Sequence, residues 1–144
     1  MEAKNFLTKA TIPIRIACIS GSGWPITISL WYVYLEEKLF CATSKNAKII
    51  EYLRNNPKCG FEVAGDLPPY RGVRGWGNVK VDEGRGMEIL RILINKYIGD
   101  ENSQLANFLL KRSKNEMAIE INPLSMFHYD YSDRMKGIVD TTNL

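Results

Sequence analysis

The alternation of apolar and polar residues divides the first third of the chain into three short strands. Apolar side chains recur at every second position in residues 12–20, which is the period of a half-buried strand. Residues 26–35 are rich in β-branched and aromatic side chains and predict a second strand, and residues 39–43 predict a third. Turn residues at 21–25 and 36–38 leave only short connections, which favour antiparallel pairing.

The pattern changes to a helical period after the third strand. Ile49, Ile50 and Leu53 have the spacing of one helix face. Ser44 is a candidate N-cap, because its hydroxyl can accept a bond from a first-turn N–H. Pro57 predicts the end of this helix.

The remainder of the chain predicts three further strands and two further helices. The strands are 58–64, 71–81 and 116–130, the helices are 84–98 and 103–112, and a proline-containing loop lies at 65–69. Helices do not alternate with single strands, so a doubly wound parallel sheet is not expected. We predict a mainly β protein, a six-stranded antiparallel barrel of Greek-key type with a few helices packed on it.

Composition places the chain among small globular proteins. Its 144 residues suit a single domain, 1–144, with a core at about 10–130 and a C-terminal tail at 131–144. A net charge of +3 is far below that of a nucleic-acid binder. No apolar run approaches the ~20 residues that cross a bilayer, and no leader is evident, so we expect a cytoplasmic protein. Three widely spaced cysteines and one histidine predict no disulfide framework and no metal site.

The sharpest candidate for chemistry lies where the third strand meets the first predicted helix. Thr43, Ser44 and Lys48 bring two hydroxyls and an ammonium group to a helix N-terminus, where unpaired N–H groups and the helix dipole favour an anion. The simpler interpretation is that Ser44 only caps the helix and Lys48 only solubilises it. On the residues alone, that simpler interpretation is favoured.

Two further groups of residues are compatible with a ligand. Arg71 and Arg74 lie among glycines, which allow a ligand to approach the backbone, and arginine is a good partner for anions. Aromatic side chains near the strand ends can wall a flat ring, although such residues more often fill a core or an interface. These aromatic residues are Trp24, Trp31, Tyr32, Tyr34 and Trp76. No catalytic residue can be identified, since His128 and Asp130 lack a nucleophile elbow beside them.

Taken together, the segments resemble the pyridoxamine 5'-phosphate oxidase-like, FMN-binding split β-barrel family. The resemblance covers about residues 10–130 and rests on the order and spacing of several short motifs. These are residues 15–20 (RIACIS), 23–25 (GWP), 28–33 (ISLWYV), 39–44 (LFCATS), Lys48, 53–57 (LRNNP), 70–77 (YRGVRGWG) and 119–123 (IEINP).

The resemblance implies a homodimer that binds two FMN molecules at the subunit interface. Thr43, Ser44 and Lys48 would then hold the phosphate, and Arg71 and Arg74 would approach the flavin or its phosphate. The residues expected along the flavin ring and ribityl chain are Thr27, Ile28, Ser29, Leu30 and Trp31. Residues 127–129 would close the ring pocket from the other chain.

Two departures from the family bear on the activity. Members often carry a second basic residue where this chain has Ile49, and the vitamin oxidases carry an arginine at the position of Thr27. We therefore expect an FMN-dependent oxidoreductase acting on a small redox substrate, and not a pyridoxamine-phosphate oxidase. The alternatives are a split-barrel protein with a deazaflavin or haem cofactor, or a non-catalytic flavin-binding module.

Overall fold

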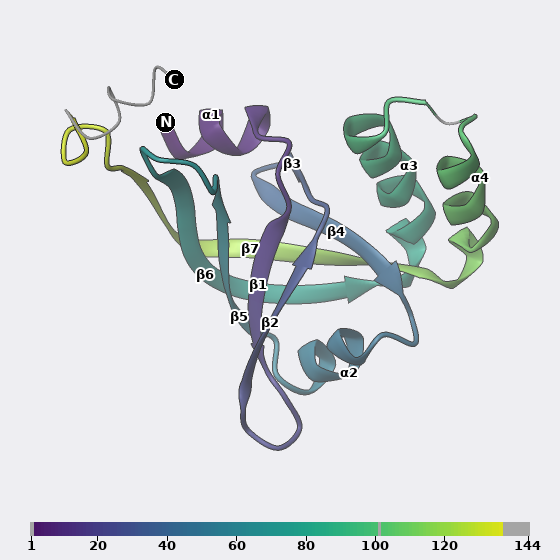
Figure 1. Ribbon diagram of the computed structural model, residues 1–144. Helices are drawn as coiled ribbons and strands as arrows, with labels where there is room; N and C mark the ends of the chain where they lie inside the picture. Colours follow the sequence, from purple (N-terminus) through teal and green to yellow (C-terminus); the bar gives the residue numbers. More distant parts are fainter. Residues whose placement is uncertain (1, 101, 137–144) are drawn as a thin grey trace.

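Seven antiparallel strands form one sheet in the computed structural model, which describes residues 2–100 and 102–136 (Figure 1). The strand order is β2-β1-β5-β6-β7-β4-β3. The strands are β1 (Ile14–Ile19), β2 (Pro25–Leu30), β3 (Val33–Leu35), β4 (Lys38–Ser44), β5 (Lys58–Ala64), β6 (Arg71–Asp82) and β7 (Glu116–Asp130). The predicted mainly β, antiparallel barrel is confirmed. The tail at 137–144 lies outside the described residues.

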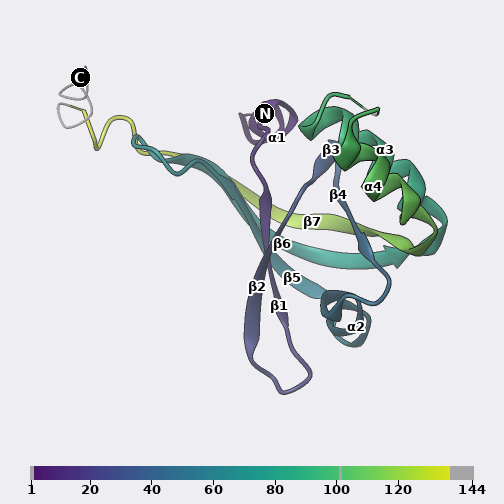
Figure 2. The ribbon, with the colours of Figure 1, turned by 45° about the vertical axis from the view of Figure 1, so that its right-hand side comes forward.

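The strand count is seven instead of six because the predicted strand at 26–35 is two strands. β2 pairs with β1 at one end of the sheet order, and β3 pairs with β4 at the other end. The break falls at Trp31 and Tyr32, between β2 and β3. The continuous chain therefore joins the two outermost strands, so that the barrel is closed covalently at this point (Figure 2).

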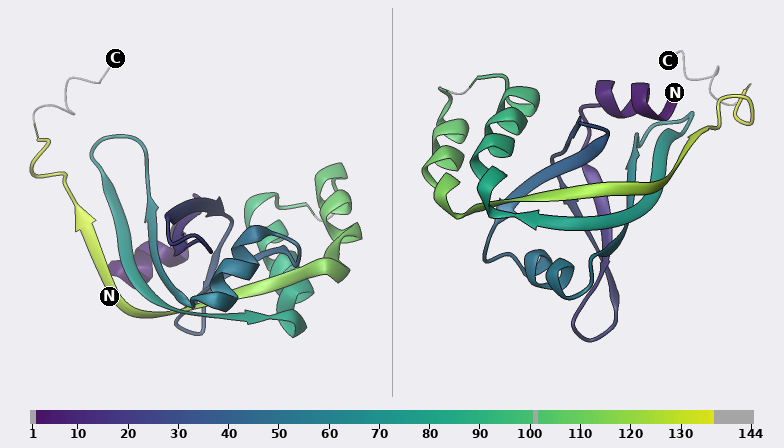
Figure 3. Two further views of the ribbon diagram at one scale, coloured as in Figure 1. Left: turned by 90° about the horizontal axis from the view of Figure 1, so that it is seen from below. Right: turned by 180° about the vertical axis from the view of Figure 1, so that it is seen from behind.

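Four helices surround the sheet: α1 (Glu2–Lys9), α2 (Lys48–Asn55), α3 (Gly86–Tyr97) and α4 (Gln104–Lys111). Short 3₁₀ turns precede α3 and β7. The three predicted helices are confirmed, whereas α1 has no counterpart among the predictions. α3 packs against β4 and β7, and α4 lies beside α3 (Figure 3). In the described part of the chain, no helix is long and apolar enough to cross a membrane.

Strand β4 separates two apolar clusters by its alternating side chains. Leu39 and Cys41 point into the barrel, where α2 contributes Ile49, Ile50 and Leu53. On the opposite face of β4, Phe40 packs under α3 against Ile89, Leu93 and Ala118. Successive residues of β4 therefore serve the barrel core and the α3 interface in turn.

The predicted N-cap at Ser44 is wrong. α2 begins at Lys48, and its N-cap is Ala47, whose side chain makes no capping bond. The Ser44 hydroxyl instead accepts a hydrogen bond from the N–H of Asn46 at 3.3 Å. The reason is that a turn at residues 45–46 intervenes between the strand and the helix.

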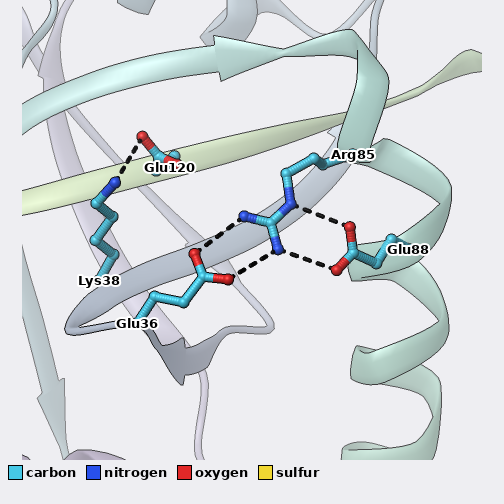
Figure 4. A network of polar contacts seen from close by, with 5 residues as sticks. All are labelled: Glu36, Lys38, Arg85, Glu88 and Glu120. Atoms are coloured by element: carbon cyan, nitrogen blue, oxygen red, sulfur yellow. Dashed lines mark hydrogen bonds and ion pairs between the residues drawn. The ribbon is translucent and has the colours of Figure 1, made fainter.

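Arg85 fixes the start of α3 above the sheet. Its guanidinium donates to Glu36, in the turn between β3 and β4, and to Glu88 on α3 (Figure 4). The same group lies 4.8 Å from the ring centroid of Phe40. These contacts hold the α3 N-terminus over β4 and β7.

Candidate functional site

The edge strand β2 carries the first group of predicted site residues. Among the described residues this strand pairs with β1 alone, so its other edge has no strand partner. Ile28 and Leu30 pack against the barrel core, whereas Thr27 and Ser29 alternate with them and face outward. The predicted run 27–31 is thus divided by its side chains: Ile28 packs against the barrel core, whereas Thr27 and Ser29 lie on the opposite face.

An outer pocket of about 660 Å³ lies on the exposed face of β1, β2, β5, β6 and β7. Thr27 lines it together with Arg74, and the side chains of Trp76 and Phe127 supply flat apolar surface. Trp76 is 61% exposed and Phe127 is 56% exposed. A groove with two exposed aromatic rings and two arginines, Arg15 and Arg74, suits a planar ligand that carries partial negative charge.

Ring stacking positions Arg74 in this outer pocket. Its guanidinium carbon lies 5.3 Å from the ring centroids of both Phe127 and Tyr129. Glu62 faces Arg74 in the β5–β6 register, but its carboxylate accepts the Tyr129 hydroxyl at 2.8 Å. Burial, with this hydrogen bond, raises the pKa of Tyr129 to about 12. No ion pair engages Arg74 within the described residues, so its N–H groups can bind an anion.

A second pocket of about 480 Å³, the helix-side pocket, lies between β2, β4 and the helices α3 and α4. It contains five of the predicted site residues: Ser29, Leu30, Trp31, Thr43 and Ser44. Its remaining walls are mainly leucines from α3 and α4. Trp31 stacks on Tyr97 with 5.0 Å between ring centroids and 5° between planes, which holds the Trp31 wall in place.

The predicted phosphate residues are neighbours, but they do not form one cluster of side chains. Thr43 and Ser44 are consecutive in β4 and point to opposite faces. Lys48 lines neither pocket; its side chain is 79% exposed and its ammonium lies 3.9 Å from Glu51. Lys48 is the first residue of α2, and the uncapped N-terminus of this helix leaves backbone N–H groups for an anion.

Arg71 is separated from the other predicted residues. It lines a pocket between α1 and the ends of β6 and β7, with His128 and Asp130. Arg71 and Arg74 are three positions apart in β6, and an odd spacing places two strand residues on opposite faces. The two arginines thus line different pockets of the single chain, and their approach to a flavin stays a prediction. His128 belongs to the α1 side as well, since its Nδ1 lies 3.2 Å from Glu2.

Two residues that the sequence analysis did not select also line the pockets. Arg15 on β1 lines the outer pocket, and Glu116 at the start of β7 lines the helix-side pocket. Glu116 is opposite Ser44 in the register, so both side chains lie on the same face. Burial raises the pKa of Glu116. Alternation alone could have placed both residues outside the barrel, but not in a pocket.

Comparison with known proteins yields structural matches only. No family model and no curated protein matches this sequence. The protein Rv2991 from Mycobacterium tuberculosis superposes with a TM-score of 0.77 at 18% identity, over 90% of this chain and 83% of its own. An F420 reductase gives 0.70 at 17% identity, over 84% and 93% of the two chains. A Listeria innocua protein provisionally named pyridoxamine 5'-phosphate oxidase gives 0.65 at 16%, over 86% and 92%.

This chain has the split β-barrel fold of the pyridoxamine 5'-phosphate oxidase-like proteins. Other split-barrel proteins of similar structure are named for different ligands. They include a FAD-binding protein from Mesorhizobium loti and the haem storage protein HutZ from Vibrio cholerae. Since all these matches lie at or below 20% identity, they establish the split-barrel fold and leave the ligand to the site itself.

Proposed function

We propose that this split-barrel protein binds FMN along strand β2, at the interface of a homodimer, and uses it as an oxidoreductase. The observation that carries the proposal is the position of β2 between two pockets. Thr27 and Arg74 line the outer pocket, whereas Ser29, Trp31 and Ser44 line the helix-side pocket. One strand with an unpaired edge thus gives access to an aromatic surface and to hydroxyl groups.

The residues present fit such a cofactor by their chemistry. Trp76 and Phe127 offer apolar surface for a flat ring, and Arg74 offers donors for its polar edge. Thr43, Lys48 and the uncapped N-terminus of α2 would hold the phosphate. When bound, a flavin supplies the electron transfer, and the protein binds, orients and shields it.

The proposed homodimer is supported by exposed apolar residues on the outer face. Trp76 and Phe127, which line the outer pocket, are 61% and 56% exposed in the single chain. A patch of this kind favours a protein partner. A second copy covering it would also exclude water from the outer pocket, where a flavin ring needs apolar surroundings.

Haem is the second candidate cofactor, and the donor set argues against it at these pockets. Haem iron in proteins is held by histidine, cysteine, methionine or tyrosine. Within the described residues, none of these four types lines the outer pocket or the helix-side pocket. His128 is engaged on the α1 side of the sheet instead.

The first experiment is an absorbance spectrum of the purified protein, with mass identification of the released ligand. Flavin absorbance and a released mass of FMN are expected. A Soret band or a deazaflavin mass would overturn the choice of cofactor. Reduction of the bound flavin by NAD(P)H, followed by reoxidation with candidate acceptors, separates an oxidoreductase from a flavin carrier. Failure of every donor and acceptor would favour the carrier.

The phosphate end is tested with Lys48→Ala, using riboflavin as the ligand that lacks the phosphate. Loss of one exposed ammonium beside a helix N-terminus should weaken FMN binding about fivefold. Riboflavin affinity should stay unchanged. Lys111→Ala, an exposed lysine on α4, is the matched control and should alter neither affinity. An equal loss for FMN and riboflavin, or no loss for either, would refute the phosphate role of Lys48.

A further inference from the structure

Glu116 gives the helix-side pocket an acidic end that the flavin proposal does not use. Its carboxylate is half-buried, and the other described side chains that line the pocket carry no charge. No hydrogen bond or ion pair engages this carboxylate among residues 2–100 and 102–136. A partly desolvated carboxylate without a partner is costly, and a bound cation removes that cost.

The rest of the helix-side pocket is apolar. Leu90 and Leu93 come from α3, Leu105 and Leu109 come from α4, and Trp31 closes the pocket from the strand side. Leu105 is 51% exposed. A ligand that fills this volume needs a hydrocarbon or aromatic body.

Phosphate does not suit the Glu116 end. Ser44 and Glu116 are paired in the β4–β7 register, so an anion bound at the Ser44 hydroxyl on that face would meet the carboxylate. Alternation turns the Thr43 side chain to the face of β4 that carries Leu39 and Cys41, although Thr43 also borders the helix-side pocket. The Glu116 carboxylate therefore favours a cation on the α3 side of β4, whereas the proposed phosphate site lies on the α2 side.

We propose that the helix-side pocket binds a small primary amine with an apolar or aromatic body, whose ammonium group pairs with Glu116. The leucines and Trp31 receive the body, and the Ser44 hydroxyl accepts a further hydrogen bond from the ammonium. This site is distinct in charge from the phosphate end. It shares Trp31 and Ser44 with the proposed flavin site, whereas its contact with Glu116 needs no cofactor.

The test uses 2-phenylethylamine as the probe and 2-phenylethanol as its neutral counterpart, with binding measured by calorimetry and tryptophan fluorescence on the purified full chain. The wild-type protein should bind the amine about tenfold more tightly than the alcohol, which is the gain expected from one charge-assisted hydrogen bond. Equal affinities, or no binding of the amine up to millimolar concentrations, would overturn the proposal.

Glu116→Gln is the decisive variant because it keeps the shape of the side chain and removes its charge. Amine affinity should fall about tenfold, and alcohol affinity should stay the same. Glu120→Gln is the matched control: it lies on the same face of β7, where its carboxylate is 3.5 Å from Lys38 (Figure 4). That variant should keep the preference for the amine. Retention of the preference in Glu116→Gln would overturn the role of Glu116.

A second variant separates binding in the pocket from binding elsewhere. Leu105→Ala removes half-exposed apolar surface from the pocket wall and is expected to leave the fold intact. It should weaken the amine and the alcohol by the same factor, because both share the body that this wall contacts. Unchanged affinity for both probes would place them outside the helix-side pocket and refute the assignment.

Discussion

Replacement of Gly86 by alanine has two opposing effects on the free energy of unfolding. Alanine favours the helical backbone, but its Cβ would clash with strand β7. Gly86 is the first residue of α3 and has helical dihedral angles, φ −58° and ψ −49°. Alanine adopts these angles freely and restricts the unfolded chain, which alone would stabilise the protein by about 0.4–1 kcal/mol. However, an added Cβ would lie 2.5 Å from the carbonyl carbon of Glu116 and closer still to its oxygen.

The contact should outweigh the local preference. The clash is with backbone of β7, which cannot turn aside as a flexible side chain can, and overpacking of this kind costs about 1–3 kcal/mol. We therefore expect Gly86→Ala to lower the free energy of unfolding by about 1–2 kcal/mol, or the melting temperature by about 3–8 °C. Urea unfolding followed by tryptophan fluorescence measures the difference.

Gly65→Ala is the matched control for this experiment. An added Cβ at Gly65 meets nothing within 4 Å, and its φ is not positive, so the variant should be neutral or slightly stabilised. If Gly86→Ala proves as stable as the wild-type protein, α3 does not approach β7 as closely as described. The shape of the helix-side pocket would then need revision, because Glu116 lies at that contact.

Two further predictions concern the outer face and the half-buried side chain of Lys96 on α3. Trp76→Arg should weaken the proposed homodimer at least about thirtyfold, as measured by light scattering against protein concentration. Phe108→Arg, at an exposed position on α4, is the control and should leave the dimer unchanged. An unchanged dimer in Trp76→Arg would place the interface elsewhere. Burial lowers the pKa of Lys96 from 10.5 to about 8. The unfolded chain thus holds this proton at pH values where the native protein has lost it, so wild-type stability should rise relative to Lys96→Met between pH 8 and 10. A relative fall would contradict the lowered pKa of the half-buried Lys96.

The sequence predicts strand positions well because alternation reports which residues are half-buried. The last strand, predicted at 116–130, matches β7 at both ends. Residues 26–35 are rich in β-branched and aromatic side chains throughout, however, and this composition cannot show that the chain changes partners at Trp31. α1 escaped prediction because Leu7 is its one fully buried residue, which is too little for a helical pattern.

For the candidate site, the sequence predicts only which face of a strand each residue occupies, because odd and even positions of a strand alternate between its two faces. Parity separates Thr27 and Ser29 from Ile28, and it separates Arg71 from Arg74. It does not reveal which helices cover a face, and the helix-side pocket depends on α3 and α4. Glu116 therefore looks like an ordinary strand-end carboxylate in the sequence, and its role follows from tertiary packing alone.

The break between β2 and β3 both closes the barrel and creates the candidate site. At the break, α3 provides the hydrogen-bond partners that a neighbouring strand would otherwise supply: the Tyr32 N–H donates to the Tyr97 hydroxyl at 3.3 Å, and the Tyr32 carbonyl accepts from Lys96 at 2.8 Å. Tyr32 then points into the core and donates to the Leu7 carbonyl, while Trp31 points the other way and lines the helix-side pocket. Within the described part of the chain, β2 pairs with β1 alone, so the backbone groups along its outer edge stay open to a ligand.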